Sequence, residues 1–428
     1  MKLLLILPDN DRGYLGGVSK SGKASFARLC LTTIAALTPE DWEVEIHDAR
    51  VKPVDYGVKA DLIGITGLTP EMPRAYEIAD GFRSRGYTVV MGGVHVSALP
   101  EEALLHCDAV VIGEAELVWA GLLDDFKRGK LKEQYRAELC EMKNMAIPRR
   151  DLLDRDMYGS GFNTLQATRG CPFNCDYCTV TSFFGNKFRV RPSDEVIDEI
   201  KGLNAKRFFF MDDNIVGRPK FAKELFEKLI PLKLSWGSQA SITLAKDPEL
   251  LKLYARSGGK YAFIGFESLS QKSLEKLQKG WNSAESYSES IKKIHDAGIS
   301  IMASFVFGLD DDDAGVFQNT YDFIIENKIN AAQFNILTPL PGTETYRKME
   351  SEGRITDRDW SKYHTGEVVY EPRGMTAEEL LNGFHRIFQK TYSIPNILKR
   401  CVANPRGLSF RIGLNMSYRK KALRMPRA

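Results

Sequence analysis

Long apolar runs are missing from this chain. No stretch of about twenty consecutive apolar residues occurs, the length that a membrane-spanning helix needs, and the apolar opening Leu3–Leu7 is far shorter. That opening has no long hydrophobic region or small-residue cleavage site, so we expect no secretion. Acidic residues are missing after Glu379, where eleven Lys and Arg accumulate, although the net charge of the whole chain is only +3. The body before Glu379 is therefore net negative, and we expect no nucleic-acid partner.

The cysteine content also excludes a class of protein. Seven cysteines are an odd number, and four of them are scattered, which does not fit a disulfide framework. The other three, Cys171, Cys175 and Cys178, lie within eight residues. This distribution predicts a metal-binding cluster, with isolated thiols elsewhere, in the reducing cytoplasm.

Residues 1–140 alternate short apolar runs with helical patterns. This alternation is typical of βαβ units, and it predicts an α/β, doubly wound, Rossmann-like domain with a parallel sheet. Strands are expected at 2–7, 43–47, 62–66, 88–91 and 109–112, with helices near 24–37, 70–85, 100–106 and 115–127.

Most of these strands end in loops that contain glycine or threonine. In open α/β sheets ligands bind at the carboxyl ends of strands, so these loops form a predicted ligand surface. A dinucleotide is not favoured, because no G-x-G-x-x-G follows the first strand. The alternative is that the glycines only form tight turns. The candidate residues are Thr66, Gly67, Gly92, Gly93, His95, Gly113 and Glu114.

A second series of strands and helices follows a charged linker at 141–158. Six expected strands, at 164–168, 207–211, 234–239, 261–267, 299–307 and 332–337, predict a (βα)6 partial barrel over 159–350. Ser193 is expected to cap one helix of this barrel, and Gly298 is expected to end another. Residues 351–428 are predicted to form a small helical, basic region.

The cysteine cluster directly follows the first predicted barrel strand. Thiolates at these short spacings can hold one soft metal centre, and three ligands leave one coordination position open. A structural zinc site needs a fourth ligand, and no second C-x2-C pair is present. An incomplete ligand set on an iron–sulfur cluster would leave one iron free to bind another molecule.

This motif, Cys171-x3-Cys175-x-Tyr177-Cys178 after the first strand of a (βα)6 series, resembles the radical S-adenosylmethionine (SAM) superfamily. The resemblance implies that the three cysteines hold a [4Fe–4S] cluster and that the free iron binds SAM. One electron from the cluster would then cleave SAM to a 5′-deoxyadenosyl radical. Tyr177 would lie against the adenine, although an aromatic residue here can also belong to the core.

Further positions resemble the SAM contacts of that family. Asp212 and Asp213 replace the usual Gly-Gly-Glu segment that meets the methionine amino group, although they also suit a helix N-cap. Gly265-Phe266-Glu267-Ser268 resembles Gly-Ile-Glu-Ser, which places Glu267 and Ser268 near the ribose and the methionine carboxylate; a solvated Glu is the alternative. The other two implied contacts are Gln239 and Gly308, of which Gly308 would let the backbone approach the adenine.

The first domain resembles the cobalamin-binding branch of the superfamily, through Gly-Gly-x-His-x-Ser at 92–97 and Ile-Gly-Glu-Ala-Glu at 112–116. No Asp-x-His-x-x-Gly is present, so His95 is expected to make a polar contact near the ring and not to ligate cobalt. The resemblance implies a methyltransferase that acts on an unactivated carbon through methylcobalamin. A cyclase, a rearrangement or a C–C coupling enzyme without net methyl transfer is the alternative, and a non-catalytic Fe–S or zinc protein is a third possibility.

The expected partners follow from this hypothesis. A small-molecule or lipid substrate and an electron donor such as flavodoxin or ferredoxin are implied. The basic C-terminal tail suggests peripheral contact with anionic lipid at the inner membrane face, whereas a helix that packs on the body is the alternative.

Overall fold

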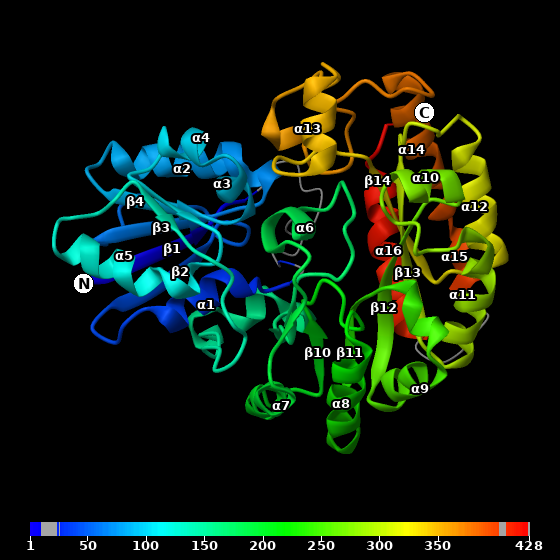
Figure 1. The fold of residues 1–428 in the computed structure, drawn as a ribbon, viewed down its shortest axis with the longest axis horizontal. Helices are drawn as coiled ribbons and strands as arrows, with labels where there is room; N and C mark the ends of the chain where they lie inside the picture. Colours follow the sequence, from blue (N-terminus) through cyan, green and yellow to red (C-terminus); the bar gives the residue numbers. More distant parts are fainter. Residues whose placement is uncertain (10–23, 25, 402–407, 427–428) are drawn as a thin grey trace.

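The computed structural model describes residues 1–9, 24, 26–401 and 408–426 and contains two six-stranded parallel sheets (Figure 1). The first sheet has the strand order β2-β1-β3-β4-β5-β6, and the second has the order β14-β13-β12-β11-β10-β7. They form two lobes, which are blue to cyan and green to yellow in Figure 1.

The N-terminal lobe matches the predicted strands closely and adds one. Its strands are β1 (Lys2–Leu7), β2 (Glu43–Asp48), β3 (Leu62–Thr66), β4 (Thr88–Gly92), β5 (Ala109–Ile112) and β6 (Gln134–Arg136). Its helices are α1 (Leu29–Leu37), α2 (Met72–Arg83), α3 (Val94–Ala98), α4 (Pro100–Leu104) and α5 (Trp119–Lys127). The three-residue β6 was not predicted, because it is too short to show a periodic pattern.

Helices cover both faces of this sheet. In β1, Leu4 and Ile6 pack in one core cluster with α2, whereas Leu3 and Leu5 pack in another with α1 and α5. Successive side chains of a strand point to opposite faces, so a strand buried on both sides needs a continuous apolar run. This requirement explains why the opening of the chain is uniformly apolar.

The second lobe is the predicted partial barrel. Its strands are β7 (Thr164–Leu165), β10 (Arg207–Phe210), β11 (Ser235–Ala240), β12 (Gly259–Glu267), β13 (Ser300–Phe307) and β14 (Ala331–Ile336), and a short antiparallel pair is formed by β8 (Thr168–Arg169) and β9 (Arg189–Val190). Its helices are α6 (Thr179–Phe184), α7 (Ser193–Gly202), α8 (Pro219–Leu229), α9 (Pro248–Arg256), α10 (Gln271–Lys276), α11 (Tyr287–Asp296), α12 (Val316–Glu326) and α13 (Glu344–Ser351).

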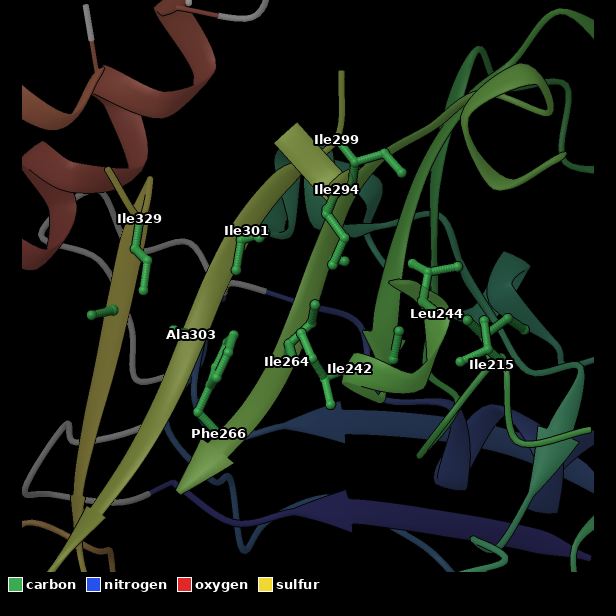
Figure 2. Close-up of a cluster of buried hydrophobic side chains, with 14 of the residues drawn as sticks. Ile215, Ile242, Leu244, Ile264, Phe266, Ile294, Ile299, Ile301, Ala303 and Ile329 are labelled. Carbon is green, nitrogen blue, oxygen red and sulfur yellow. The ribbon is translucent and has the colours of Figure 1, made fainter. Parts of the chain in front are cut away.

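Alternate residues of the barrel strands form the core. Ile264 and Phe266 of β12 lie with Ile301 and Ala303 of β13 in one cluster of buried apolar side chains (Figure 2). Gly298 follows α11 with φ +80°, as expected of a residue that ends a helix. Ser193 is not the N-cap that we predicted. Helix α7 already includes it, and its hydroxyl donates to Glu224 instead.

The C-terminal region closes the free edge of β14. Its helices are α14 (Ala377–Thr391), α15 (Ile394–Cys401) and α16 (Leu408–Ala422). The Tyr392 hydroxyl accepts a hydrogen bond from Ala332 N, at 3.0 Å, and donates one to Ala332 O. Arg400 is fully buried and donates to the carbonyls of Ile329 and Asn330, both at 3.2 Å. An unpaired strand edge is thus covered by the chain itself.

Part of the basic tail is therefore packed against the body of the protein. Arg419 donates to the Tyr392 carbonyl at 3.0 Å, and burial lowers the pKa of Lys421 to about 7. Among the described residues, no helix combines the length and the apolar character that crossing a bilayer requires.

Candidate active site between the two sheets

The cysteine loop leaves the barrel at the end of β8. Gly170 begins it with φ +83°, and a Cβ there would collide with the carbonyl oxygen of Lys187. Only glycine fits this backbone, and the chain can then turn into Cys171–Cys178. Cys178 lies at the N-cap position of α6. The spacing that the sequence shows is therefore placed at the mouth of the barrel.

All three thiols are free and close enough to one another to affect their ionisation. Burial raises the pKa of Cys175 to about 12 against the opposing charge of Lys279, and burial also raises the pKa of Cys171 and Cys178. Buried thiolates need a compensating cation, and an iron–sulfur cluster supplies it. The donor set thus fits a cluster that takes three ligands from the protein.

The segment after β10 holds the cysteine loop in place. The Asp212 carboxylate is fully buried and accepts hydrogen bonds from Ala167 N at 3.1 Å, from Thr168 N, and from Thr168 Oγ1 at 2.6 Å. Asp213 accepts one from Gly170 N at 3.1 Å. Burial is the main cause that raises their pKa values, to about 7 and about 6.

Asp212 is therefore committed to the strand that precedes the cysteines, and a contact of either aspartate with SAM stays a prediction. Asn214 was not among the predicted site residues. Its Nδ2 lies 3.9 Å from Cys171 Sγ, while its Oδ1 accepts from Ser241 N at 3.0 Å. A single sequence gives no signal for this contact, because Asn214 and Cys171 are 43 positions apart.

Glu267 and Tyr177 meet beside the cluster loop, together with a residue that the sequence did not indicate. Lys279 is 5% exposed, and its Nζ lies 2.6 Å from Glu267 Oε1. Burial, and then the charge of Glu267, raises the pKa of Tyr177 well above its usual value. The Lys279 charge acts to lower the pKa of Cys175 against the effect of burial. A buried cation thus faces both the Glu267 carboxylate and the thiols.

The remaining predicted SAM contacts lie on neighbouring strands. The Gln239 carbonyl at the end of β11 accepts from Ile215 N at 3.1 Å, and Ser268 Oγ accepts from Ser270 N at 3.0 Å. Gly308 has φ +86°, but a Cβ there would meet Tyr370 and Leu380. Gly308 therefore makes room for the C-terminal region, and an approach of its backbone to adenine stays a prediction.

The glycine loops of the N-terminal lobe come together at the carboxyl edge of its sheet. Thr66 Oγ1 donates to Gly92 O at 2.9 Å across β3 and β4, and Gly93 has φ +111°. Gly113 after β5 has φ +89° and donates its N–H to Ser97 Oγ at 3.0 Å. Gly67 follows Thr66 on the same edge. Leu68 and Leu117 in these loops are 49% and 60% exposed, so the edge presents apolar surface beside the glycine backbone.

His95 and Glu114 lie at this edge but are already engaged with protein groups. The His95 side chain is fully buried, with Nε2 3.2 Å from Glu102 Oε1. Glu114 Oε1 lies 2.6 Å from Arg189 Nη2 and 3.3 Å from Arg169 Nη1. Their roles at a cofactor stay predictions.

The ion pairs of Glu114 are strong enough to reverse the effect of burial. Burial would raise its pKa, but the hydrogen bond from Arg189 and the charge of Arg169 lower it to about 2. Glu114, Glu116 and Cys140 are close enough to share a cation. Arg169 and Arg189 of the barrel pair with the two carboxylates of this cluster, so its charges join the lobes.

The two carboxyl edges face each other. Helix α3, after β4, contacts α6 of the cysteine loop, which lies between the lobes in Figure 1. A Cβ on Gly342 would lie 3.1 Å from Ala98 Cβ of α3 and 3.8 Å from Ser182 Oγ of α6. The Glu114–Arg169 pair joins the loop after β5 to the residue just before Gly170. We call the loops at Gly67, Gly92–Gly93 and Gly113 the glycine edge. The glycine edge and the cysteine loop therefore belong to one composite site.

Comparison with known proteins agrees with this division. Residues 26–123 match a family model described as the B12 binding domain, 165–324 match the Radical SAM superfamily, and 343–424 match a domain of unknown function, DUF4070. A bacteriochlorophyllide d C-12(1)-methyltransferase of Chlorobaculum tepidum is 36% identical over 94% of this chain and 90% of its own length. The chain belongs to the radical SAM superfamily, in the branch with a B12-binding domain.

A second relative supports the same family, and solved structures show the same fold. The bacteriochlorophyllide d C-8(2)-methyltransferase of the same organism is 34% identical over 91% of the chain and 90% of its own length. The cobalamin-dependent radical enzyme OxsB has a TM-score of 0.70, at 17% identity over 98% of this chain and 71% of its own. The methyltransferase TsrM of Kitasatospora setae has a TM-score of 0.64, at 16% identity over 82% and 78%.

The predicted family, fold class and enzyme class are thus confirmed. As a member of this branch the chain is a radical SAM enzyme of the cobalamin-dependent methyltransferase type, with a [4Fe–4S] cluster, SAM and cobalamin as its cofactors. The domain boundaries and the roles of individual site residues stay predictions.

Proposed function

We propose that this enzyme transfers a methyl group to an unactivated carbon of a small molecule held between the glycine edge and the cysteine loop. The observation that carries this proposal is the facing of the two edges, joined by α3 with α6 and by Glu114 with Arg169. A methyl donor on one edge and a radical source on the other must reach the same carbon, and the fixed contacts bring both within reach of one substrate.

Each edge has a role that its own residues support. Cys171, Cys175 and Cys178 would hold the cluster, while Glu267 and Lys279 would bind the polar groups of SAM and Tyr177 would pack on its adenine. The loops at Gly67, Gly92–Gly93 and Gly113 would hold cobalamin. When bound, the cluster with SAM supplies the radical oxidant and cobalamin supplies the methyl group. The protein positions these groups and excludes water from them.

We propose a hydrophobic, multi-ring substrate, with a chlorin-type tetrapyrrole as the first to test. This choice rests on the two bacteriochlorophyllide d methyltransferases, which align with nearly the whole chain. A lipid is the second choice, since a hopanoid C-2 methylase of Rhodopseudomonas palustris is 26% identical over 77% of the chain and 65% of its own length.

The test is anaerobic reconstitution with iron, sulfide and hydroxocobalamin, followed by incubation with a low-potential chemical reductant, methyl-labelled SAM and bacteriochlorophyllide d or a hopanoid. Mass spectrometry of a methyltransferase product shows the gain of one CH2 with the labelled carbon. A product without that gain, formed together with 5′-deoxyadenosine, would support cyclisation or rearrangement instead.

The partners form the finer part of the proposal. A flavodoxin- or ferredoxin-type protein would reduce the cluster in the cytoplasm. Membrane contact would use α15, where Ile394 and Leu398 are 41% and 48% exposed beside Lys399, and not the buried Arg400. Replacing Ile394 and Leu398 with serine should reduce co-sedimentation with anionic liposomes. Unchanged co-sedimentation would end this part of the proposal.

A further inference from the structure

One loop of the C-terminal region touches both lobes at the composite site. Residues 355–370, here called the clasp, form a loop closed at its base by an antiparallel bridge between Ile355 and Tyr370. Two backbone hydrogen bonds strengthen the base, from Glu371 N to Arg354 O at 2.8 Å and from Thr356 N to Val369 O at 3.0 Å. The clasp is therefore a closed loop, so a movement at its tip and a movement at its base are coupled.

The tip of the clasp lies on the glycine edge, where cobalamin is predicted to bind. Its short helix η9 (Trp360–Lys362) packs against α2 and against η1 (Thr69–Glu71), which follows the loop after β3. The Trp360 ring meets His95, after β4, edge-on with ring centres 5.2 Å apart. The helix η9 thus contacts the region after β3, and its Trp360 contacts the region after β4.

A carboxylate anchors this tip. Trp360 Nε1 donates to Glu102, at 3.0 Å from each carboxylate oxygen. Glu102 also accepts from Tyr76 at 2.8 Å and contacts His95 at 3.2 Å. Burial would raise the pKa of Glu102, but these donors lower it, so the acceptor is ionised at neutral pH. A hydrogen bond to a charged acceptor is among the stronger kinds.

The other side of the clasp is fixed to the mouth of the barrel. Thr365 O accepts from Ile336 N at 2.8 Å, and Thr365 Oγ1 donates to Asn335 Oδ1 at 3.0 Å. Tyr370 donates to the carbonyl of Gly308. Thr365 has φ +63°, which is unfavourable for a β-branched residue, and such strain persists only where surrounding contacts enforce it. These contacts hold the clasp at the ends of β13 and β14.

We propose that the clasp is a positioning element that aligns the cobalamin edge with the barrel mouth, and that Trp360 and Glu102 are its positioning residues. This inference rests on the proposed function, in which the methyl donor and the radical source must be aligned to reach the same carbon. It also assigns a role to part of the C-terminal domain of unknown function, 343–424. Loss of the Trp360 hydrogen bond would leave each lobe folded but less well aligned.

The test compares Trp360→Phe with Trp119→Phe. Trp119 is a matched control, because its Nε1 also donates one hydrogen bond, to Thr38 Oγ1 at 2.9 Å, but within the N-terminal lobe. In the cofactor-free chain, hydrogen–deuterium exchange of α3, α4 and the clasp should rise roughly tenfold in Trp360→Phe, the scale of one hydrogen bond to a charged group. Trp119→Phe should leave these segments unchanged. Glu102→Gln, which removes the acceptor's charge, should reproduce the Trp360→Phe pattern.

A second readout follows the coupling of the two half-sites. The cluster-loaded Trp360→Phe enzyme should form 5′-deoxyadenosine at the parental rate but bind hydroxocobalamin several-fold more weakly in an absorbance titration. Unchanged exchange in α3 and α4, or unchanged hydroxocobalamin affinity, would overturn the role of the clasp. If instead the parent chain cleaves SAM but binds no hydroxocobalamin, the proposed function fails. The exchange experiment then still tests whether the clasp stabilises α3 and α4.

Discussion

The cysteine loop and the glycine edge are built in opposite ways. Burial raises the pKa of each of the three thiols and outweighs the nearby hydrogen bonds and the Lys279 charge that act against it. The charged side chains at the glycine edge are already paired, Glu114 with Arg169 and Arg189, and Glu102 with Trp360. The thiols of the first region are free to bind a cofactor. The charges of the second region join the lobes, and its backbone and apolar surface remain for a ligand.

The largest expected effect concerns the open thiols. Cys175→Ala removes one of the three predicted cluster ligands, so 5′-deoxyadenosine formation should fall to background and the iron content after reconstitution should drop. Cys107→Ala is the control, because Cys107 is also buried but donates to Ala103 O within the N-terminal lobe. Full SAM cleavage by Cys175→Ala would refute the assignment of the cluster ligands.

The second effect concerns the buried pair beside the thiols. Lys279→Met leaves the Glu267 carboxylate buried without its partner, and removing one member of a buried pair destabilises by about 3 kcal/mol. The urea midpoint of the cofactor-free chain should fall, and Glu267→Gln in the same chain should restore much of it. Lys292→Met breaks only an exposed pair with Asp296 and should change nothing measurable. Equal effects of the two lysine variants would show that Lys279 is not a buried partner.

The third effect concerns the ion pairs of Glu114 and is measured as the pH dependence of folding stability. The pKa of Glu114 lies at about 2, below its ordinary value of 4.5. Its ionised form therefore stabilises the folded chain above pH 4.5 by about 3 kcal/mol, and this stabilisation is lost as the pH falls from 4.5 towards 2. Glu114→Gln should be less stable than the parent at pH 7, and the difference should shrink below pH 4.5 and close near pH 2. Parallel stability curves for the two chains would contradict this account.

The smallest effect compares two glycines with almost the same backbone. Gly308 and Gly86 have φ +86° and +85°, but a Cβ meets Tyr370 and Leu380 at the first and nothing within 4 Å at the second. Alanine at Gly86 should therefore cost about 1 kcal/mol, from the backbone alone. Alanine at Gly308 should cost roughly 1–3 kcal/mol more, from crowding. Thermal unfolding of both variants measures the difference. Equal decreases in the unfolding midpoint would show that Tyr370 and Leu380 move to accommodate the added methyl group at Gly308.

The strands were the most predictable part of the fold. Strands such as β1, β3, β5 and β13 are short apolar runs bounded by polar or glycine-containing turns, so local sequence decides their position. The misses have local reasons too. β6 is only three residues long, and Ser193 donates to Glu224, a residue distant in sequence, instead of capping its helix. The interpretation of the basic tail was less reliable, because a charge pattern does not show that Arg400 is buried among backbone carbonyls.

The sequence by itself determined the cysteine motif and the two sheets, because thiol spacing and apolar periodicity are properties of neighbouring residues. Only the tertiary structure decided that Lys279 faces Glu267, that Asn214 approaches Cys171, and that Trp360 reaches Glu102 across 258 positions. These pairs form when parallel strands bring their carboxyl ends together and the two lobes dock. No short-range pattern records such contacts, since each partner alone looks like an ordinary polar or aromatic residue.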